Sequence, residues 1–183
     1  MLYIDLIRSI DITQEYYSIS FKLPDIDVFP FQKIYIRPSY KEIYDEIFAL
    51  VNQKKTLIPI YHRYIITGVP GIGKTQFLPY FICRFLRDTK HQSFFIQTEG
   101  QLVRYYDTYG ITEMSSVPYH LKHVPLFADI KKPEPAITTN YMFIFSSPDP
   151  ARFKQDADQG YKLVIPISTY CNQLAMPMLY IIE

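Results

Sequence analysis

The stretch Tyr64-Ile65-Ile66-Thr67-Gly68-Val69-Pro70-Gly71-Ile72-Gly73-Lys74-Thr75 determines the fold that we expect for this chain of 183 residues. Its last eight residues match the phosphate-binding pattern G-x-x-x-x-G-K-[ST] at every position. The apolar residues before the match indicate a short buried strand, and residues 76–87 are typical of a helix. Strand, loop and helix in this order are the context that the pattern requires. Three of the six glycines lie in the match, where they let the backbone approach a ligand closely.

This loop predicts a site for a nucleoside triphosphate, ATP or GTP, with Mg²⁺. Its N–H groups would converge on phosphate oxygens, aided by the positive end of the following helix. Lys74 is expected to reach the β- and γ-phosphates, and the Thr75 hydroxyl to bind Mg²⁺. An accidental match in an ordinary turn is the alternative. The predicted nucleotide-binding residues are Gly68, Val69, Pro70, Gly71, Ile72, Gly73, Lys74, Thr75 and Gln76.

The composition favours one globular domain of ordinary size. Hydrophobic residues make up 48% of the chain and charged residues 20%, so disorder of the whole chain is not expected. The net charge of +1 gives no indication of nucleic-acid binding. No apolar run reaches membrane-spanning length, and the N-terminus does not resemble a signal peptide. Cys83 is expected in the core, and the four histidines lack the spacing of a metal site.

Five apolar segments predict the strands of a sheet. They are residues 64–67, 93–97, 124–129, 141–145 and 161–165. Helical or loop crossovers between them predict an α/β fold of the P-loop NTPase type, with a parallel sheet of about five strands and helices on both faces. The predicted strand order is 5-1-4-3-2, with the fourth strand between the phosphate-loop strand and the strand that ends at Asp129.

The rest of the chain is predicted to form an N-terminal arm and one domain. The arm covers residues 1–38, and the P-loop domain covers residues 39–183. Ser39 is expected to cap a helix, in a capping box with Glu42. Pro79 is expected to kink the helix after the phosphate loop, because it removes a helical hydrogen bond.

Asp129 is the predicted second ligand of Mg²⁺. P-loop enzymes hold the metal with an aspartate that ends an apolar strand, and Asp129 follows Leu126-Phe127-Ala128. A turn aspartate is the alternative. Many P-loop ATPases place a glutamate directly after this aspartate, whereas Ile130 follows here. Glu99, just past the second strand, is therefore the candidate for activating water, with a solvated loop glutamate as the alternative.

Polar residues after the fourth strand are candidates for sensing the γ-phosphate. Ser146 and Ser147 end that strand, where they could instead cap the turn into Pro148. Arg152 and Lys154 could reach phosphate, with ordinary surface charge as the alternative.

Several segments, in order along the chain, resemble the P-loop domain of Crinkler effectors and of the related retrotransposon hot spot proteins. They are Ile36-Arg37-Pro38 to Phe48, Tyr64 to Thr75, Phe127-Ala128-Asp129, Phe143 to Asp149, and Arg152-Phe153-Lys154. The resemblance covers about residues 36–166, and Ser-Ser-Pro after the fourth strand is its more specific part. It implies an ATPase or GTPase module of a secreted effector that acts in a host cell, often in the nucleus, with a host protein as partner.

The chain departs from this family at both ends. Residues 1–30 carry no Crinkler-type leader, and the family's tryptophan-containing segment has no counterpart after Ile165-Pro166. We therefore expect the family's later segments, and a lid with an arginine, to be lost or replaced. Three functions stay open at this point: nucleotide binding with hydrolysis, a nucleotide-switched protein-binding module, and a small-molecule kinase.

Overall fold

A computed structural model describes residues 3–14, 16–18, 33–53, 62–67, 74–98, 100, 102–130, 137–146, 163–166 and 180–181. Its helices are α1 (Tyr3–Ser9), α2 (Pro38–Gln53) and α3 (Lys74–Thr89), with a short 3₁₀ helix η2 (Tyr119–Leu121). A small two-stranded sheet pairs β1 (Tyr16–Ser18) with β2 (Lys33–Tyr35). The main sheet contains β3 (His62–Thr67), β4 (Phe94–Thr98), β5 (Val103–Tyr106), β6 (Ile111–Met114), β7 (Leu126–Asp129), β8 (Tyr141–Ser146), β9 (Leu163–Pro166) and β10 (Tyr180–Ile181).

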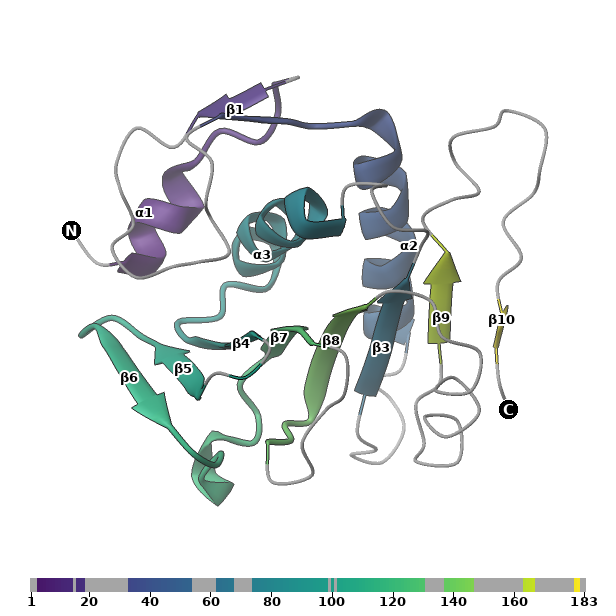
Figure 1. Ribbon diagram of the computed structural model, residues 1–183. Helices are drawn as coiled ribbons and strands as arrows, with labels where there is room; N and C mark the ends of the chain where they lie inside the picture. Colours follow the sequence, from purple (N-terminus) through teal and green to yellow (C-terminus); the bar gives the residue numbers. More distant parts are fainter. Residues whose placement is uncertain are drawn as a thin grey trace.

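The main sheet has eight strands in the order β10-β9-β3-β8-β7-β4-β5-β6 (Figure 1). This order differs from the predicted five-stranded one because β10 is added at one edge and the hairpin β5–β6 at the other. The sheet is also mixed, since these three strands are antiparallel to their neighbours, whereas β9, β3, β8, β7 and β4 run parallel. As predicted, β8 lies between β3 and β7.

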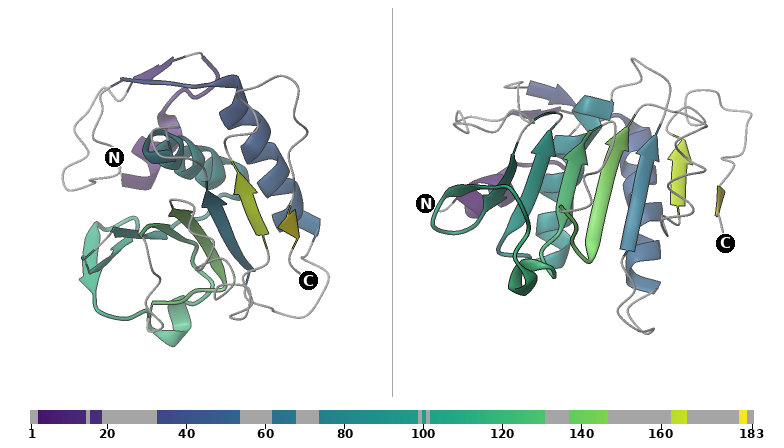
Figure 2. Two further views of the ribbon diagram at one scale, coloured as in Figure 1. Left: turned by 45° about the vertical axis from the view of Figure 1, so that its right-hand side comes forward. Right: turned by 60° about the horizontal axis from the view of Figure 1, so that its bottom comes forward.

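The prediction of helices on both faces is wrong for the part of the chain that the structure describes. There, α1, α2 and α3 all lie on one face of the sheet (Figures 1 and 2). The opposite face is covered by non-helical residues that include Val117, Val124 and Ile137. The crossovers on that side contain a hairpin and several prolines, and proline does not continue a helix.

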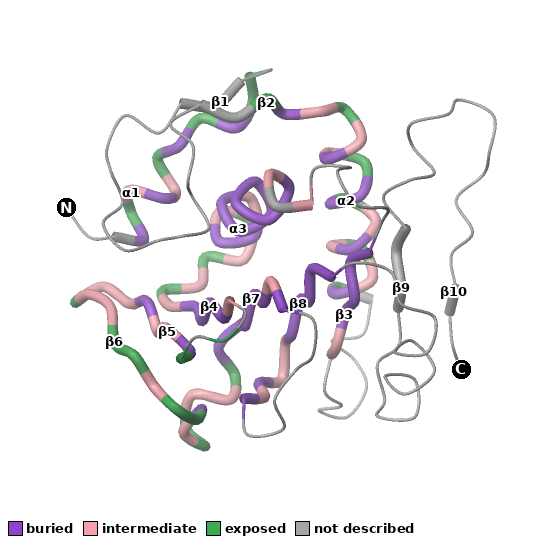
Figure 3. The backbone as a smooth tube through the Cα atoms, in the orientation of Figure 1, coloured by how far each residue is buried: buried purple, intermediate pink, exposed green. Residues whose placement is uncertain are grey.

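α3 is the central helix of the core, which is built from aromatic residues. It packs on β7 and β8, and α1 and α2 pack against it. Phe77, Phe81 and Phe85 recur at four-residue steps, and all three are buried. Figure 3 shows that most of α3 is buried. The predicted core residue Cys83 is confirmed as buried, and burial raises the pKa of its thiol.

Two details of the helices bear on the sequence predictions. α2 begins at Pro38, so Ser39 lies inside the first turn and the predicted capping box is wrong. Proline suits the first helical position because its fixed φ matches the helix and it has no N–H to satisfy. α3 continues through Pro79, and a kink there stays a prediction.

The N-terminal residues are part of the same core as the sheet. Ile4 and Ile7 on α1 are buried, and so are Ile10 and Ile12 after it. Arg8 donates hydrogen bonds to the carbonyl oxygens of Leu86 (3.3 Å) and His91 (2.6 Å), at and just beyond the end of α3. The predicted arm therefore includes a helix that packs on the helix following the phosphate loop.

Candidate nucleotide-binding site

Four parallel strands end at one edge of the sheet with polar residues. β3, β8, β7 and β4 lie side by side in this order and end at Thr67, Ser146, Asp129 and Thr98. Thr67 pairs in register with Ser146, and Thr98 pairs with Asp129. Ligands of α/β sheets bind outside the carboxyl ends of the strands. This edge is therefore the candidate site.

Lys74 and Asp129 lie near one another at this edge. α3 begins at Lys74, directly after the loop that follows β3. Burial lowers the pKa of the Lys74 ammonium group, and the negative charge of Asp129 acts in the opposite direction. The two residues are 55 positions apart in sequence (129 − 74), so the fold brings them into electrostatic reach, as the predicted metal and phosphate roles require.

Alternation along the strands assigns the polar residues to faces. Asp129 lies two residues after Phe127, which packs in the core beneath the helices, so Asp129 is on the same face as α3. Thr98 lies two residues after Ile96, which belongs to the same part of the core, so Thr98 is on the face of α3 as well. Ser146 follows Ile144, a core residue of the opposite face. The predicted γ-phosphate sensor Ser146 thus lies on the other face from Asp129, and it is buried.

Two buried polar residues at this edge were missed by sequence reasoning. Thr67 and Gln97 are each 3% exposed. Neither Thr67 Oγ1 nor Gln97 Oε1 has a hydrogen-bond partner within the described residues. Leaving such a group unpartnered costs about 1–3 kcal/mol. The available signal was a polar residue near the end of each apolar run, directly before the phosphate loop in one case and two residues before Glu99 in the other.

Several predicted site residues lie outside the described residues. They are Gly68, Val69, Pro70, Gly71, Ile72, Gly73, Glu99, Ser147, Arg152 and Lys154. Thr75 lies in the first turn of α3, but its side chain is not among those described. Gln76, in the same turn, is half-buried. The roles of these residues stay predictions.

A metal at this site would have few protein ligands. Within the described residues, no group of three or more His, Cys, Asp or Glu side chains could hold a metal ion. Mg²⁺ usually keeps several waters and is bound through one or two carboxylates and the phosphates of the substrate. Asp129, the Thr75 hydroxyl and a triphosphate therefore form a chemically suitable donor set for Mg²⁺.

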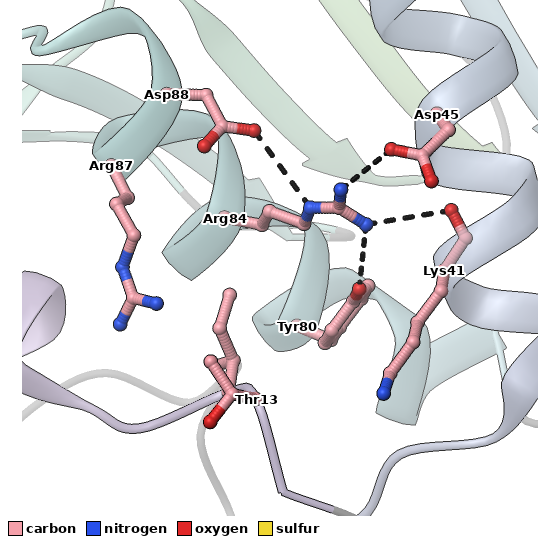
Figure 4. Close-up of a pocket in the computed structure, with 8 residues that line it drawn as sticks. Thr13, Lys41, Asp45, Tyr80, Arg84, Arg87 and Asp88 are labelled. Atoms are coloured by element: carbon pink, nitrogen blue, oxygen red, sulfur yellow. Dashed lines mark hydrogen bonds and ion pairs between the residues drawn. The ribbon is translucent and has the colours of Figure 1, made fainter.

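A separate hollow of about 340 Å³ lies between α2, α3 and the N-terminal segment (Figure 4). Arg84 is at its centre. The guanidinium donates to Asp45 Oδ1 (2.5 Å), to the Tyr80 hydroxyl (3.0 Å) and to the Lys41 carbonyl oxygen (3.5 Å). It also lies 3.7 Å from Asp88 Oδ2. These contacts tie α2 to α3, so we assign Arg84 a structural role.

Nucleotide affinity is expected to decrease as the pH rises into the alkaline range. Burial lowers the pKa of Lys74, so its ammonium group loses its proton at a lower pH than an exposed lysine. The charged form attracts phosphate. The attraction is therefore complete below the lowered pKa and is lost as the pH rises through it. Calorimetric titration with a non-hydrolysable triphosphate, from neutral pH to the ordinary lysine pKa, measures this dependence.

Lys74→Arg provides the control for this pH dependence. The guanidinium stays charged throughout the same range, so the variant should lack the alkaline decrease. A wild-type profile as flat as that of the arginine variant would contradict a charged Lys74 as the phosphate contact.

Comparison of the chain with protein-family models, with curated proteins and with solved structures finds no match. In the part of the chain that is described, no helix is both long and apolar enough to pass through a bilayer.

Proposed function

We propose that this protein binds ATP or GTP with Mg²⁺ and hydrolyses the terminal phosphate. One observation carries the proposal. The G-x-x-x-x-G-K-T sequence follows β3 directly and ends in the first turn of α3, and the fold brings Asp129 into electrostatic reach of its lysine. An accidental match in a turn would not require an aspartate from another strand beside the lysine. Phosphoryl-transfer sites of this class combine these two groups.

In the proposed reaction, Lys74 and the backbone N–H groups of residues 68–73 other than Pro70 hold the phosphates. Thr75 and Asp129 would bind Mg²⁺, which neutralises charge on the β- and γ-phosphates when bound. Water attacks the γ-phosphorus in line with the bond that breaks, which releases the diphosphate and inorganic phosphate. Each protein group contributes position and charge rather than covalent chemistry.

Glu99 is the proposed group that activates water, because Ile130 occupies the position after Asp129. Thr98, which precedes Glu99 in the sequence, pairs with Asp129 across neighbouring parallel strands. The end of β4 is therefore adjacent to the proposed metal ligand. Ser146 and Ser147 at the end of β8 remain the proposed contacts to the γ-phosphate.

The resemblance to Crinkler effectors and retrotransposon hot spot proteins extends this proposal to a biological setting. The chain would be the nucleotide-binding module of a secreted effector that acts in a host cell, with a host protein as partner. Support comes from the ordered segments between residues 36 and 166.

Replacement of Asp129 by asparagine is expected to reduce Mg²⁺-dependent phosphate release by about 100-fold or more, because the variant loses the charge that holds the metal. Nucleotide binding without Mg²⁺ should change little, since Lys74 and the loop remain. Release of phosphate from ATP and GTP, with and without Mg²⁺, measures the first effect, and calorimetry measures the second.

Asp5→Asn is the matched control, because Asp5 is an exposed aspartate on α1, far along the chain from the site. It should retain wild-type phosphate release. If Asp129→Asn retained it too, the metal role of Asp129 would be wrong. If the wild type neither bound nor hydrolysed either nucleotide, the whole proposal would fail.

A second candidate function is a nucleotide-switched protein-binding module. The buried, apolar Ile130 directly after Asp129 favours it, because this position carries no group that could activate water. Tight, Mg²⁺-dependent nucleotide binding without measurable phosphate release would support this function over hydrolysis.

A further inference from the structure

Gln97 is a buried polar residue in an apolar row of the sheet. It pairs in register with Ala128 on β7, and Ala128 pairs with Ile144 on β8. Gln97 lies two residues after Phe95, so it is on the face opposite the helices. No hydrogen-bond partner for its carboxamide oxygen lies within the described residues. Buried polar groups normally have partners, so packing alone does not account for a glutamine here.

The position of Gln97 relates it to the proposed reaction. The next residue, Thr98, pairs with the proposed metal ligand Asp129. Gln97 also shares its face with Ile130, which stands where many P-loop ATPases carry the glutamate that activates water. Ala128, its neighbour on β7, has only a methyl side chain, which leaves more room for a water molecule beside the carboxamide than a larger residue would.

We propose that Gln97 is a positioning residue for the hydrolysis reaction. Its carboxamide oxygen accepts a hydrogen bond from a bound water, and that water orients the attacking water. This inference rests on the proposed function. In the step, the attacking oxygen bonds to the γ-phosphorus, the bond to the β–γ bridging oxygen breaks, and a proton of the attacking water passes to the released phosphate. Gln97 takes no proton, because a carboxamide is not basic, and it acts only through geometry.

Gln97→Met tests this role, because methionine has a similar shape without polar groups. We expect kcat for phosphate release to fall about 10- to 100-fold, since orientation of the attacking water is lost. KM and nucleotide affinity should stay within roughly twofold of wild type. The urea midpoint of unfolding should be unchanged or higher, because an unpartnered buried polar atom is removed. Gln92→Met, at an exposed glutamine beyond α3, is the matched control.

Gln97→Glu tests rescue by a side chain that keeps an acceptor oxygen. A carboxyl oxygen accepts a hydrogen bond in both protonation states. Turnover of this variant should therefore be higher than that of Gln97→Met, because the bound water keeps its hydrogen-bond acceptor. A merely structural glutamine would give no such recovery, since a buried carboxyl group is more costly than a methionine side chain.

Two results would overturn the inference. One is a wild-type kcat in Gln97→Met. The other is a lower kcat accompanied by an equal loss of nucleotide affinity and a lower unfolding midpoint, which would indicate a structural glutamine. If the wild type itself releases no phosphate, hydrolysis fails and this inference fails with it. If the wild type releases phosphate and Gln97→Met releases it at the same rate, only the positioning role of Gln97 is rejected.

Discussion

Lys74→Ala is expected to weaken binding of ATP or GTP by about 30- to 1,000-fold, which corresponds to about 2–4 kcal/mol. The lysine is half-buried at the start of α3, and the charge of Asp129 acts on it. Its removal would deprive bound phosphates of the positive charge of Lys74 while the negative charge of Asp129 remains. Calorimetric titration with a non-hydrolysable triphosphate and Mg²⁺ measures the loss directly.

Lys41→Ala is the control for charge alone, since Lys41 is a half-exposed lysine on α2 and belongs to the separate hollow beside Arg84. Its effect on affinity should be below about threefold, because surface charges contribute little. Both variants should unfold at the wild-type urea midpoint. Normal nucleotide affinity in folded Lys74→Ala would reject the phosphate-loop assignment.

Phe81→Ala is expected to destabilise the protein by about 3–5 kcal/mol, the usual cost of deleting a fully buried phenylalanine side chain. Phe81 has 0% exposure at the centre of the helix face. Its ring centroid lies 5.0 Å from that of Phe143 and 5.1 Å from that of Tyr44, and it stacks on Phe85. Because small domains have a total stability of about 5–15 kcal/mol, this loss would remove a large part of the stability of the protein.

Urea unfolding followed by circular dichroism measures this loss. Phe81→Leu should lose less, because leucine leaves a smaller cavity. Tyr109→Ala, at a side chain with 96% exposure, should change stability by less than about 0.5 kcal/mol. Equal stability of Phe81→Ala and Tyr109→Ala would contradict the aromatic core around α3.

The strand before the phosphate loop and the helix after it could be predicted because their signals are local. The apolar run before the loop became β3, and the Phe77-Phe81-Phe85 stripe became the buried face of α3. Asp129 could be placed at the edge as well, because parallel strands that end in the same direction bring their last residues together. These predictions needed only the spacing of the apolar residues, the polar residue at the end of a strand and the direction in which the strands run.

The hairpin β5–β6 was not among the predicted strands, although residues 107–110 carry a turn signal between its two strands. Asp107 Oδ1 accepts hydrogen bonds from the N–H groups of Tyr109 (2.7 Å) and Gly110 (3.0 Å). Gly110 has a φ of 152°, which side chains rarely allow. Asp and Gly between two runs of aromatic and β-branched residues are a hairpin signal.

The face on which each helix packs could not be read from the sequence. An amphipathic pattern shows that a helix has a buried side. Both faces of a parallel sheet are apolar, however, so a helix can pack on either of them. α1 was missed for a related reason, since Ile4 and Ile7 on seven residues give too short a pattern. Its stability comes from packing on α3 rather than from the segment itself.

During synthesis, α1 leaves the ribosome long before the helix on which it packs. Arg8 and its partner Leu86 are 78 residues apart, so the loop between them must close before this contact can form. Until then, Ile4 and Ile7 have no partner on α3 and present apolar surface to the solvent. Exposed apolar segments of this kind favour aggregation of nascent chains and binding by chaperones. α1 is thus made well before α3 and completes its native contacts late.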